Sequence, residues 1–462
     1  MTSGFKLIPT GEEAFSARVG MIRESKETLC LQYYMVHYDL TGKTIINELL
    51  HAADRGVKIK LLLDNLYIGD ISETLNILNA HENIEVRNFN PSTRPHRFIF
   101  VKLLIWIFSL KRYSRRMHNK AIVADDKLAL VGGRNLGDEY FGFYSNFTFS
   151  DMDVYCHGSI AKQIRQSFDA YWENENTAQF ADLPEPRRAE KIIRKLRVTL
   201  YHFQKRVAFM EAISPSNNTA HTKFALTDAN LCEGRGYFCA DDPNKITIPL
   251  DQVKSAPMEA LNGLLEDAKE ELIIVTPYCI PQEKGMAHIK ALIERGLKVK
   301  ILTNSLSSTD VSVVHACYSR YRKALLEAGV EIYELKSIPG KRTRQNLFRR
   351  AERSSLHAKA YVVDRKYALL GSCNFDPRSR NLNTETGLVV ECDEMVKELL
   401  EMFDEITQPE AAYKLRLDTK GRLRWQTKHK KKVKTYRSDP KPGPLRRIAA
   451  FLFYYFAPED QL

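Results

Sequence analysis

Hydrophobic and polar positions alternate along the first ninety residues with two periods, one typical of helices and the other of strands. Apolar residues recur at helical spacing in three segments, residues 12–25, 44–56 and 72–82, and Gly56 closes the second of them. Strand character follows each of them, at residues 28–36, 57–65 and 84–89. The continuous apolar run at 57–65 is typical of a strand buried in a parallel sheet. This alternation predicts an α/β domain with a parallel or mixed sheet.

The same order of elements returns in the second half of the chain, at residues 259–278, 287–305 and 319–336. Arg55 and Arg295, each followed by Gly, are 240 positions apart, and a repeated histidine, His118 and His357, recurs after 239. So constant an offset indicates an internal duplication. We therefore predict two α/β lobes, each a mixed β-sheet flanked by helices, related by a pseudo-twofold axis that joins them at one shared site.

Four regions follow from these patterns. Residues 1–180 form the first lobe, which carries an apolar insert with basic flanks at 94–116, and residues 251–410 form the second. Residues 181–250 interrupt the repeat with a basic helical linker region that begins at a Pro-rich boundary. Residues 411–462 form a basic and apolar tail without a counterpart in the first half.

The strongest repeated motif reads RRMHNKAIVADDKLALVGGRN in the first half and SSLHAKAYVVDRKYALLGSCN in the second. Each copy predicts a strand, a tight turn and a second strand. Residues two apart in a strand face the same way, so each histidine lies beside the lysine two positions later. The glycines that follow let the backbone and the asparagine amide approach a ligand closely. Two such halves make a cationic pocket suited to a phosphate ester.

Composition indicates the charge of the binding partner but does not identify the partner. The chain of 462 residues is 44% hydrophobic and 27% charged, which is typical of a globular protein. A net charge of +12 favours an anionic partner, either nucleic acid or an anionic membrane.

Eight cysteines are scattered without a C-x-x-C pair, which predicts buried, reduced thiols in a cytosol-facing protein rather than a disulfide framework or zinc site. The first residues lack the features of a signal peptide, and no run of apolar residues is long enough for a spanning helix.

The duplicated His-x-Lys-(x)4-Asp motif, followed by Gly-Gly or Gly-Ser and then Asn, resembles the signature of the phospholipase D superfamily. Further segments, among them AADRGVKIKLLLDN and LTNSLSSTDVSVVHACYSRYRKALLEAGVEIYELK, are similar to the bacterial cardiolipin synthase C group within it. The resemblance covers roughly residues 12–180 and 255–425.

The resemblance implies a set of site residues. The catalytic motif residues are His118, Lys120, Asp125, His357, Lys359 and Asp364. The residues expected to hold the substrate phosphate are Asn135, Asn374, Ser372 and Gly133. It also implies no metal and no cofactor, because lysines supply the positive charge. The residues themselves give Asp125 and Asp364 a different role: at the strand-turn boundary, they are expected to organise the turn or an ion pair.

In this superfamily an acidic residue after each motif holds the catalytic histidine. The matching positions are Asp151 and Glu385, and we expect Asp151 with Gly133 to support His118, and Glu385 with Ser372 to support His357. A carboxylate on Nδ1 fixes the tautomer that leaves Nε2 facing the substrate. Asp153 competes with Asp151 for this role.

The resemblance implies a phosphohistidine mechanism in which His118 is the nucleophile and His357 the acid and base, with the reverse assignment open. We expect a membrane-associated phosphatidyltransferase that makes cardiolipin from phosphatidylglycerol and a second phospholipid, such as phosphatidylethanolamine. The alternative is a phospholipase D or nuclease-type phosphodiesterase. We expect no nucleic-acid partner, a peripheral or monotopic position on the cytoplasmic side of the bacterial inner membrane, and an oligomeric state that the sequence leaves open.

Two apolar stretches with basic flanks favour membrane contact, one at 94–116 and one from Leu445 that follows a run of lysines. The expected contact residues are Phe98, Trp106, Phe108, Phe451 and Phe453. The alternative is that both stretches pack as ordinary core or dimer helices. His315 lies on a predicted helix with several basic residues, and either a solvated basic surface or lipid headgroup recognition fits it.

Overall fold

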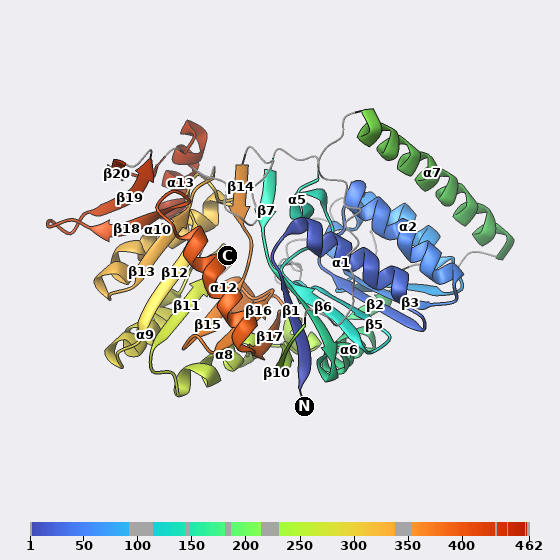
Figure 1. The fold of residues 1–462 in the computed structure, drawn as a ribbon, viewed down its shortest axis with the longest axis horizontal. Helices are drawn as coiled ribbons and strands as arrows, with labels where there is room; N and C mark the ends of the chain where they lie inside the picture. The colour runs from blue at the N-terminus through green and yellow to red at the C-terminus, as the bar shows by residue number, and fades with distance from the viewer. Residues whose placement is uncertain are drawn as a thin grey trace, which may run out of the picture.

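The computed structural model describes residues 2–91, 114–143, 147–180, 186–213, 231–337, 353–429, 432–440, 442–457 and 459. Its two halves lie side by side, the N-terminal half on the right in Figure 1 and the C-terminal half on the left.

The first lobe is built on a mixed sheet in the spatial order β9-β4-β3-β2-β5-β6-β8-β1. Its strands are β1 (Ser3–Ile8), β2 (Thr28–Tyr33), β3 (Lys58–Asp64), β4 (Ile84–Phe89), β5 (Ala121–Ala124), β6 (Leu128–Gly132), β8 (Asp153–Gly158) and β9 (Thr177–Gln179). Strands β2, β3 and β4 are parallel, and the remaining neighbours pair antiparallel.

The second lobe repeats this sheet in the order β18-β13-β12-β11-β15-β16-β17. Its strands are β11 (Glu271–Val275), β12 (Lys298–Asn304), β13 (Glu331–Leu335), β15 (Ala360–Val363), β16 (Tyr367–Gly371), β17 (Thr386–Glu391) and β18 (Ala412–Leu417). Strands β19 (Leu423–His429) and β20 (Lys432–Tyr436) extend it beyond β18. Because β10 (Cys232–Ala240) pairs with β1 on one side and β17 on the other, the two lobes share one continuous sheet. The predicted pair of duplicated α/β lobes is confirmed.

Helices cover both faces of this sheet. The longer ones are α1 (Gly11–Glu24), α2 (Leu40–Asp54), α3 (Ser72–Asn79), α6 (Ser159–Trp172), α7 (Pro186–Ile213), α8 (Ala256–Glu266), α9 (Gln282–Glu294), α10 (Ser312–Glu327), α12 (Asp393–Ile406) and α13 (Pro444–Phe456). The helices α1, α2 and α3 bury one core in the first lobe, and α8, α9 and α10 bury its counterpart in the second. The third core contains residues of α6 and α12 and is continuous between the lobes. The lobes are therefore joined by buried apolar contact as well as by strand pairing.

Corresponding helices of the two lobes end in the same way, at a glycine in the left-handed conformation. After α2, Gly56 takes a φ of +93°, and after α9, Gly296 takes a φ of +97°. These left-handed conformations favour glycine because it lacks a Cβ, and they turn the chain into the following parallel strand. The sequence expectation that Gly56 closes its helix is thus explained.

The cysteines depart in part from expectation. Six are free, but Cys232 and Cys392 form a disulfide with a Cα to Cα distance of 6.8 Å, so the prediction that all thiols are reduced is wrong for this pair. The two residues are 160 positions apart, and only the docking of β10 beside the start of α12 brings them together. Among the described residues, the longest apolar helical stretches fall short of what a bilayer crossing requires.

A buried ionic cluster fixes α1 to the sheet. Asp153 Oδ2 on β8 accepts hydrogen bonds from Arg18 (2.9 Å) and Arg134 (3.1 Å), and the Asp153 side chain is fully buried. Asp153 therefore has a structural role and is not the carboxylate that competes with Asp151.

We predict that Asp153→Ala lowers the free energy of unfolding by about 3–5 kcal/mol, because two buried guanidinium groups lose their counter-charge. Asp169→Ala is the matched control, since Asp169 pairs with Arg165 at 2.9 Å on the exposed face of α6 and its side chain is 41% exposed. That change is expected to cost less than about 1 kcal/mol. Chemical denaturation measures both, and equal small losses would contradict a structural role for Asp153.

Candidate active site

Each motif forms the predicted hairpin, β5–β6 in the first lobe and β15–β16 in the second. Both turns have two residues with positive φ, as type I′ turns require. The Asp125 carboxylate accepts the backbone N–H groups of residues 26–28 at 2.8–2.9 Å, and Asp364 accepts those of residues 269–271 at 2.8–3.1 Å. The structure thus gives Asp125 and Asp364 the turn-organising role, and their inclusion among the catalytic residues is corrected.

The two motif histidines are paired with carboxylates of the opposite lobe. Nδ1 of His118 lies 2.9 Å from Oε2 of Glu385, and Nδ1 of His357 lies 2.6 Å from Oδ2 of Asp151. The expectation that Asp151 supports His118 and that Glu385 supports His357 is therefore wrong. The two carboxylates are those predicted, but they are exchanged.

Strand pairing across the seam, the boundary at which the two lobes meet, explains this exchange. The short strand β7 (Phe147–Ser150), which precedes Asp151, pairs in parallel with β14 (Arg353–Leu356), which precedes His357. The His357 backbone N–H donates to the Ser150 carbonyl at 2.7 Å, so Asp151 and His357 leave the paired strands together (Figure 1).

The mirror arrangement lies on the other side of the seam. The His118 N–H donates to the Thr384 carbonyl at 2.9 Å, and the Thr384 N–H donates to the Arg116 carbonyl at 2.8 Å. Glu385 directly follows Thr384, which brings its carboxylate to His118. Neither half of the chain completes its own histidine site.

Gly133 and Ser372, expected to hold phosphate, instead serve the carboxylates. A Cβ on Gly133 would lie 2.3 Å from Oδ1 of Asp151, so glycine leaves the space that this side chain occupies. The Ser372 hydroxyl donates to Oε2 of Glu385, and Ser379 donates to Oε1 at 2.9 Å. These contacts hold both carboxylates in place.

The motif lysines are buried beside their histidines. Nζ of Lys120 donates to the His118 carbonyl at 2.6 Å, and Nζ of Lys359 donates to the His357 carbonyl and lies 3.0 Å from His357 Nδ1. Burial lowers the pKa of Lys120 to about 7 and also lowers the pKa of Lys359. Because each lysine charge acts on the histidine of the other lobe, all these groups belong to one site.

Burial also keeps the imidazoles neutral. It lowers the pKa of His118 to about 4 and of His357 to about 3, although the paired carboxylates oppose both shifts. Burial would raise the pKa of Asp151 and Glu385, but the paired histidines and nearby lysines hold the pKa of each below its ordinary value. A neutral imidazole whose Nδ1–H donates to a carboxylate keeps a lone pair on Nε2.

The motif asparagines retain unused hydrogen-bonding capacity. Asn135 donates through Nδ2 to the Tyr140 hydroxyl at 2.9 Å, and Tyr140 packs edge-on against the His357 ring. The backbone N–H of Asn374 donates to Ser379, which contacts Glu385. The side-chain oxygens of both asparagines are buried without a partner among the described residues.

Aromatic side chains that the sequence reasoning missed enclose the histidines. The Tyr34 ring lies 5.1 Å from that of His118, and the Phe149 ring lies 4.8 Å from that of His357. Tyr34 directly follows β2, the strand that pairs with the first motif hairpin. This position in the sequence could have identified Tyr34 as a residue near the site.

Only two of the five expected membrane-contact residues lie within the described part of the chain. Phe98, Trp106 and Phe108 fall outside the described residues. Phe451 and Phe453 lie on α13 and are 64% and 40% exposed.

His315 is buried, so the expectation that it lies on a solvated basic surface is wrong. Its Nε2 lies 2.7 Å from Arg322 and 3.4 Å from Asp439, a residue of the tail. His315 therefore belongs to an ionic contact that fastens the tail to α10.

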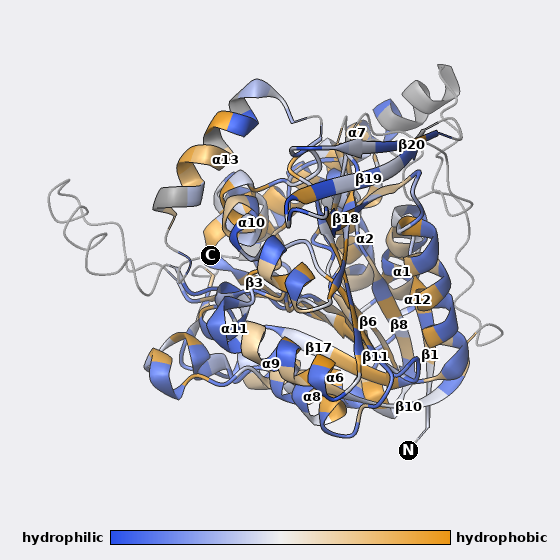
Figure 2. Ribbon diagram, turned by 90° about the vertical axis from the view of Figure 1, so that its left-hand side faces the viewer, coloured by the Kyte–Doolittle hydropathy of each residue, from blue (hydrophilic) through white to orange (hydrophobic). Residues whose placement is uncertain are grey.

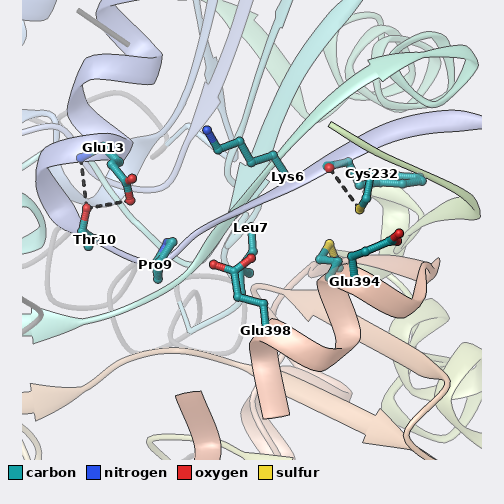
Figure 3. Close-up of a pocket in the computed structure, with 10 residues that line it drawn as sticks. Lys6, Leu7, Pro9, Thr10, Glu13, Cys232, Glu394 and Glu398 are labelled. Carbon is teal, nitrogen blue, oxygen red and sulfur yellow. Dashed lines mark hydrogen bonds between the residues drawn. The ribbon is translucent and has the colours of Figure 1, made fainter. Parts of the chain in front are cut away.

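A separate pocket of about 320 Å³ lies at the seam between β1 and α12, lined by Lys6, Glu13, Glu394 and Glu398 among others (Figure 3). No motif residue lines it. This pocket is therefore separate from the histidine site.

Comparison with known proteins agrees with this geometry. The family described as "Cardiolipin synthase, PLD-like domain" matches residues 19–172 and 261–407, one segment in each lobe. Cardiolipin synthase C of Escherichia coli is 35% identical over 94% of this chain and 91% of its own length. A cardiolipin synthase of Geobacillus kaustophilus is 24% identical over 87% of this chain and 66% of its own length.

Among solved structures, the phosphatidylserine synthase of Haemophilus influenzae shares the fold, with a TM-score of 0.60 at 14% identity over 99% of this chain and 95% of that one. Since the family match covers both lobes and the Escherichia coli relative is similar over almost the whole chain, this protein belongs to the cardiolipin synthase family of phosphatidyltransferases with phospholipase-D-like domains.

Proposed function

We propose that this enzyme makes cardiolipin by transferring the phosphatidyl group of phosphatidylglycerol to a second phospholipid through a phosphohistidine intermediate. The observation that carries the proposal is the pair of buried neutral imidazoles, each held by a carboxylate of the opposite lobe beside a buried lysine. Relatives named cardiolipin synthase support the choice of product.

In the first step, Nε2 of His118 attacks the phosphorus, and the bond to the glycerol oxygen breaks as the phosphorus–nitrogen bond forms. The leaving oxygen takes a proton from His357. Both histidines have a depressed pKa before substrate binds, but an anionic phosphodiester beside them favours the imidazolium and raises the pKa of His357. Lys120 and Lys359 stabilise the charge on the non-bridging oxygens.

In the second step, the neutral His357 takes the proton of the incoming hydroxyl, and that oxygen attacks phosphorus. The phosphorus–nitrogen bond breaks, and His118 returns to its starting form. The carboxylates stay ionised throughout and stabilise whichever imidazole carries positive charge. Burial of the site limits the competing attack by water.

We further propose that α13 rests on the membrane surface. Its exposed apolar side chains are Ile448, Phe451, Leu452 and Phe453. Figure 2 shows orange segments along α13, which stands beside α10. Arg447 is exposed near its start, and lysines are exposed on β20, which precedes α13 in the chain, a combination suited to anionic lipid.

The position of α13 would bring the site to the lipid. Nη1 of Arg446 donates to the carbonyls of residues 306, 307 and 309 at 2.9–3.4 Å, and Arg320 of α10 donates to the Tyr454 carbonyl at 2.8 Å. The loop whose carbonyls accept hydrogen bonds from Arg446 follows Asn304. Asn304 in turn hydrogen-bonds to the backbone of Leu356, which directly precedes His357.

With vesicles of phosphatidylglycerol, we expect the purified enzyme to release glycerol and form cardiolipin in equal amounts, measured by mass spectrometry. His118→Ala and His357→Ala should each lower the rate roughly 10²–10⁴-fold, whereas His202→Ala, at an exposed position of α7, should not. Phosphatidic acid as the sole lipid product would identify a phospholipase D. Cleavage of single-stranded DNA without any lipid product would contradict the proposal altogether.

Replacing Ile448 and Phe451 together with Ser should weaken binding to phosphatidylglycerol vesicles at least about tenfold, because each buried apolar side chain contributes roughly 1.5–3 kcal/mol. Vesicle flotation measures the bound fraction. The matched control is the double change of Val198 and Tyr201 to Ser, since both are about half exposed on α7 (51% and 52%). Equal loss in both variants, or in neither, would show that α13 does not carry membrane binding.

A further inference from the structure

One carboxylate near the site has no part in the steps described above. Asp310 lies in the loop between β12 and α10, at the carboxyl end of a parallel strand, where ligands of such sheets commonly bind. The loop is fixed to the histidine site because Asn304, the last residue of β12, exchanges two hydrogen bonds of 2.9 Å with the backbone of Leu356.

The Asp310 side chain is oriented but only half satisfied. Its Oδ2 accepts the Tyr278 hydroxyl at 2.8 Å. Its Oδ1 is buried and accepts no hydrogen bond of good geometry among the residues that the structure describes, although the backbone N–H groups of Asp310 and Val311 lie close to the carboxylate. A buried carboxylate oxygen of this kind has the capacity to accept a further hydrogen bond.

The Asp310 carboxylate interacts electrostatically with side chains of the site. It acts on Lys359, which adjoins His357, and on Tyr140, whose ring packs against His357. Burial raises the pKa of Asp310, while the Tyr278 hydrogen bond and the Lys359 charge oppose that rise. The carboxylate therefore lies on the His357 side of the site.

The internal repeat shows that this feature is particular to the second lobe. Asp70 holds the same place in the first lobe, six residues after the end of β3 as Asp310 is six residues after the end of β12. Asp70 is exposed. In that region of the first lobe, Tyr67 packs against Tyr34, which contacts His118. The two corresponding loops thus differ, since that of the first lobe places an aromatic ring near His118 and has only an exposed carboxylate, whereas that of the second lobe carries the Asp310 carboxylate.

We propose that Asp310, oriented by Tyr278, binds a hydrogen-bond-donating group of the phospholipid headgroup that leaves or enters at His357. This inference rests on the proposed phosphatidyl transfer and names the residue that recognises the headgroup. A carboxylate repels the substrate phosphate, which the lysines attract, so its partner is a donor: a glycerol hydroxyl or an ethanolamine ammonium.

The test compares two activities of the full-length enzyme. One is cardiolipin formation in vesicles of phosphatidylglycerol alone or mixed with phosphatidylethanolamine. The other is hydrolysis of bis(p-nitrophenyl) phosphate, whose leaving group carries no donor for Asp310. We expect Asp310→Asn to lower the ratio of transfer to hydrolysis about tenfold or more, the effect of weakening one charged hydrogen bond. Most of the loss should lie in the KM for lipid.

Tyr278→Phe keeps the carboxylate and removes its orienting contact, so it should lower the same ratio by a smaller factor and provides a test if Asp310→Asn folds poorly. Asp70→Asn is the matched control and should leave the ratio at the wild-type value. An equal loss in both lipid mixtures identifies a hydroxyl as the bound group, and a loss confined to mixtures with phosphatidylethanolamine identifies the ammonium.

The inference is overturned if Asp310→Asn and Tyr278→Phe lower both activities in parallel, or neither. A wild-type enzyme that hydrolyses the soluble ester but forms no cardiolipin would instead refute the proposed function, so the two failures are distinguishable.

Discussion

The hydrogen bond between each motif histidine and a carboxylate of the opposite lobe is the interaction on which the site depends. His118 needs Glu385, and His357 needs Asp151, so neither lobe can orient its own imidazole. This requirement explains the extensive contact between the lobes, in which β1 pairs with β10, a third apolar core is continuous between the lobes, and β7 pairs with β14 immediately before Asp151 and His357. Each copy of the duplicated motif contributes one histidine, and because each histidine is held by a carboxylate of the opposite lobe, the two copies form one site.

The electrostatics follow from that burial. Two lysines and two carboxylates lie around two neutral imidazoles, and burial lowers the pKa of Lys120 to about 7 because burying a positive charge is costly. An anionic phosphodiester relieves this cost and raises the pKa values of the lysines and histidines together. In the proposed mechanism, binding of substrate would thus protonate His357, which then supplies the proton that the leaving oxygen requires. The aromatic rings around the histidines keep these interactions in a medium of low dielectric constant, where they are strongest.

Much of this arrangement could be predicted from the chain alone. The repeat offset predicted two lobes, the strand-turn-strand pattern predicted both hairpins, and the positions of Asp151 and Glu385 identified the two carboxylates. Which carboxylate serves which histidine could not be predicted, because the order of residues along the chain does not reveal that β7 pairs with β14. The same limit hid the contact between Cys232 and Cys392. His315 was misjudged for a related reason: its helix has a basic stripe, but Asp439 of the tail covers it.

Histidine-selective ¹⁵N NMR tests the exchange of carboxylates most directly, because an imidazole N–H that donates to a carboxylate has a proton resonance far downfield. The two signals can be assigned with His118→Gln and His357→Gln, each of which removes one. We predict that Glu385→Gln shifts or abolishes the signal of His118 and leaves that of His357, and that Asp151→Asn does the reverse. If Glu385→Gln instead perturbs His357 while His118 keeps its signal, each lobe orients its own histidine and the account given above is wrong.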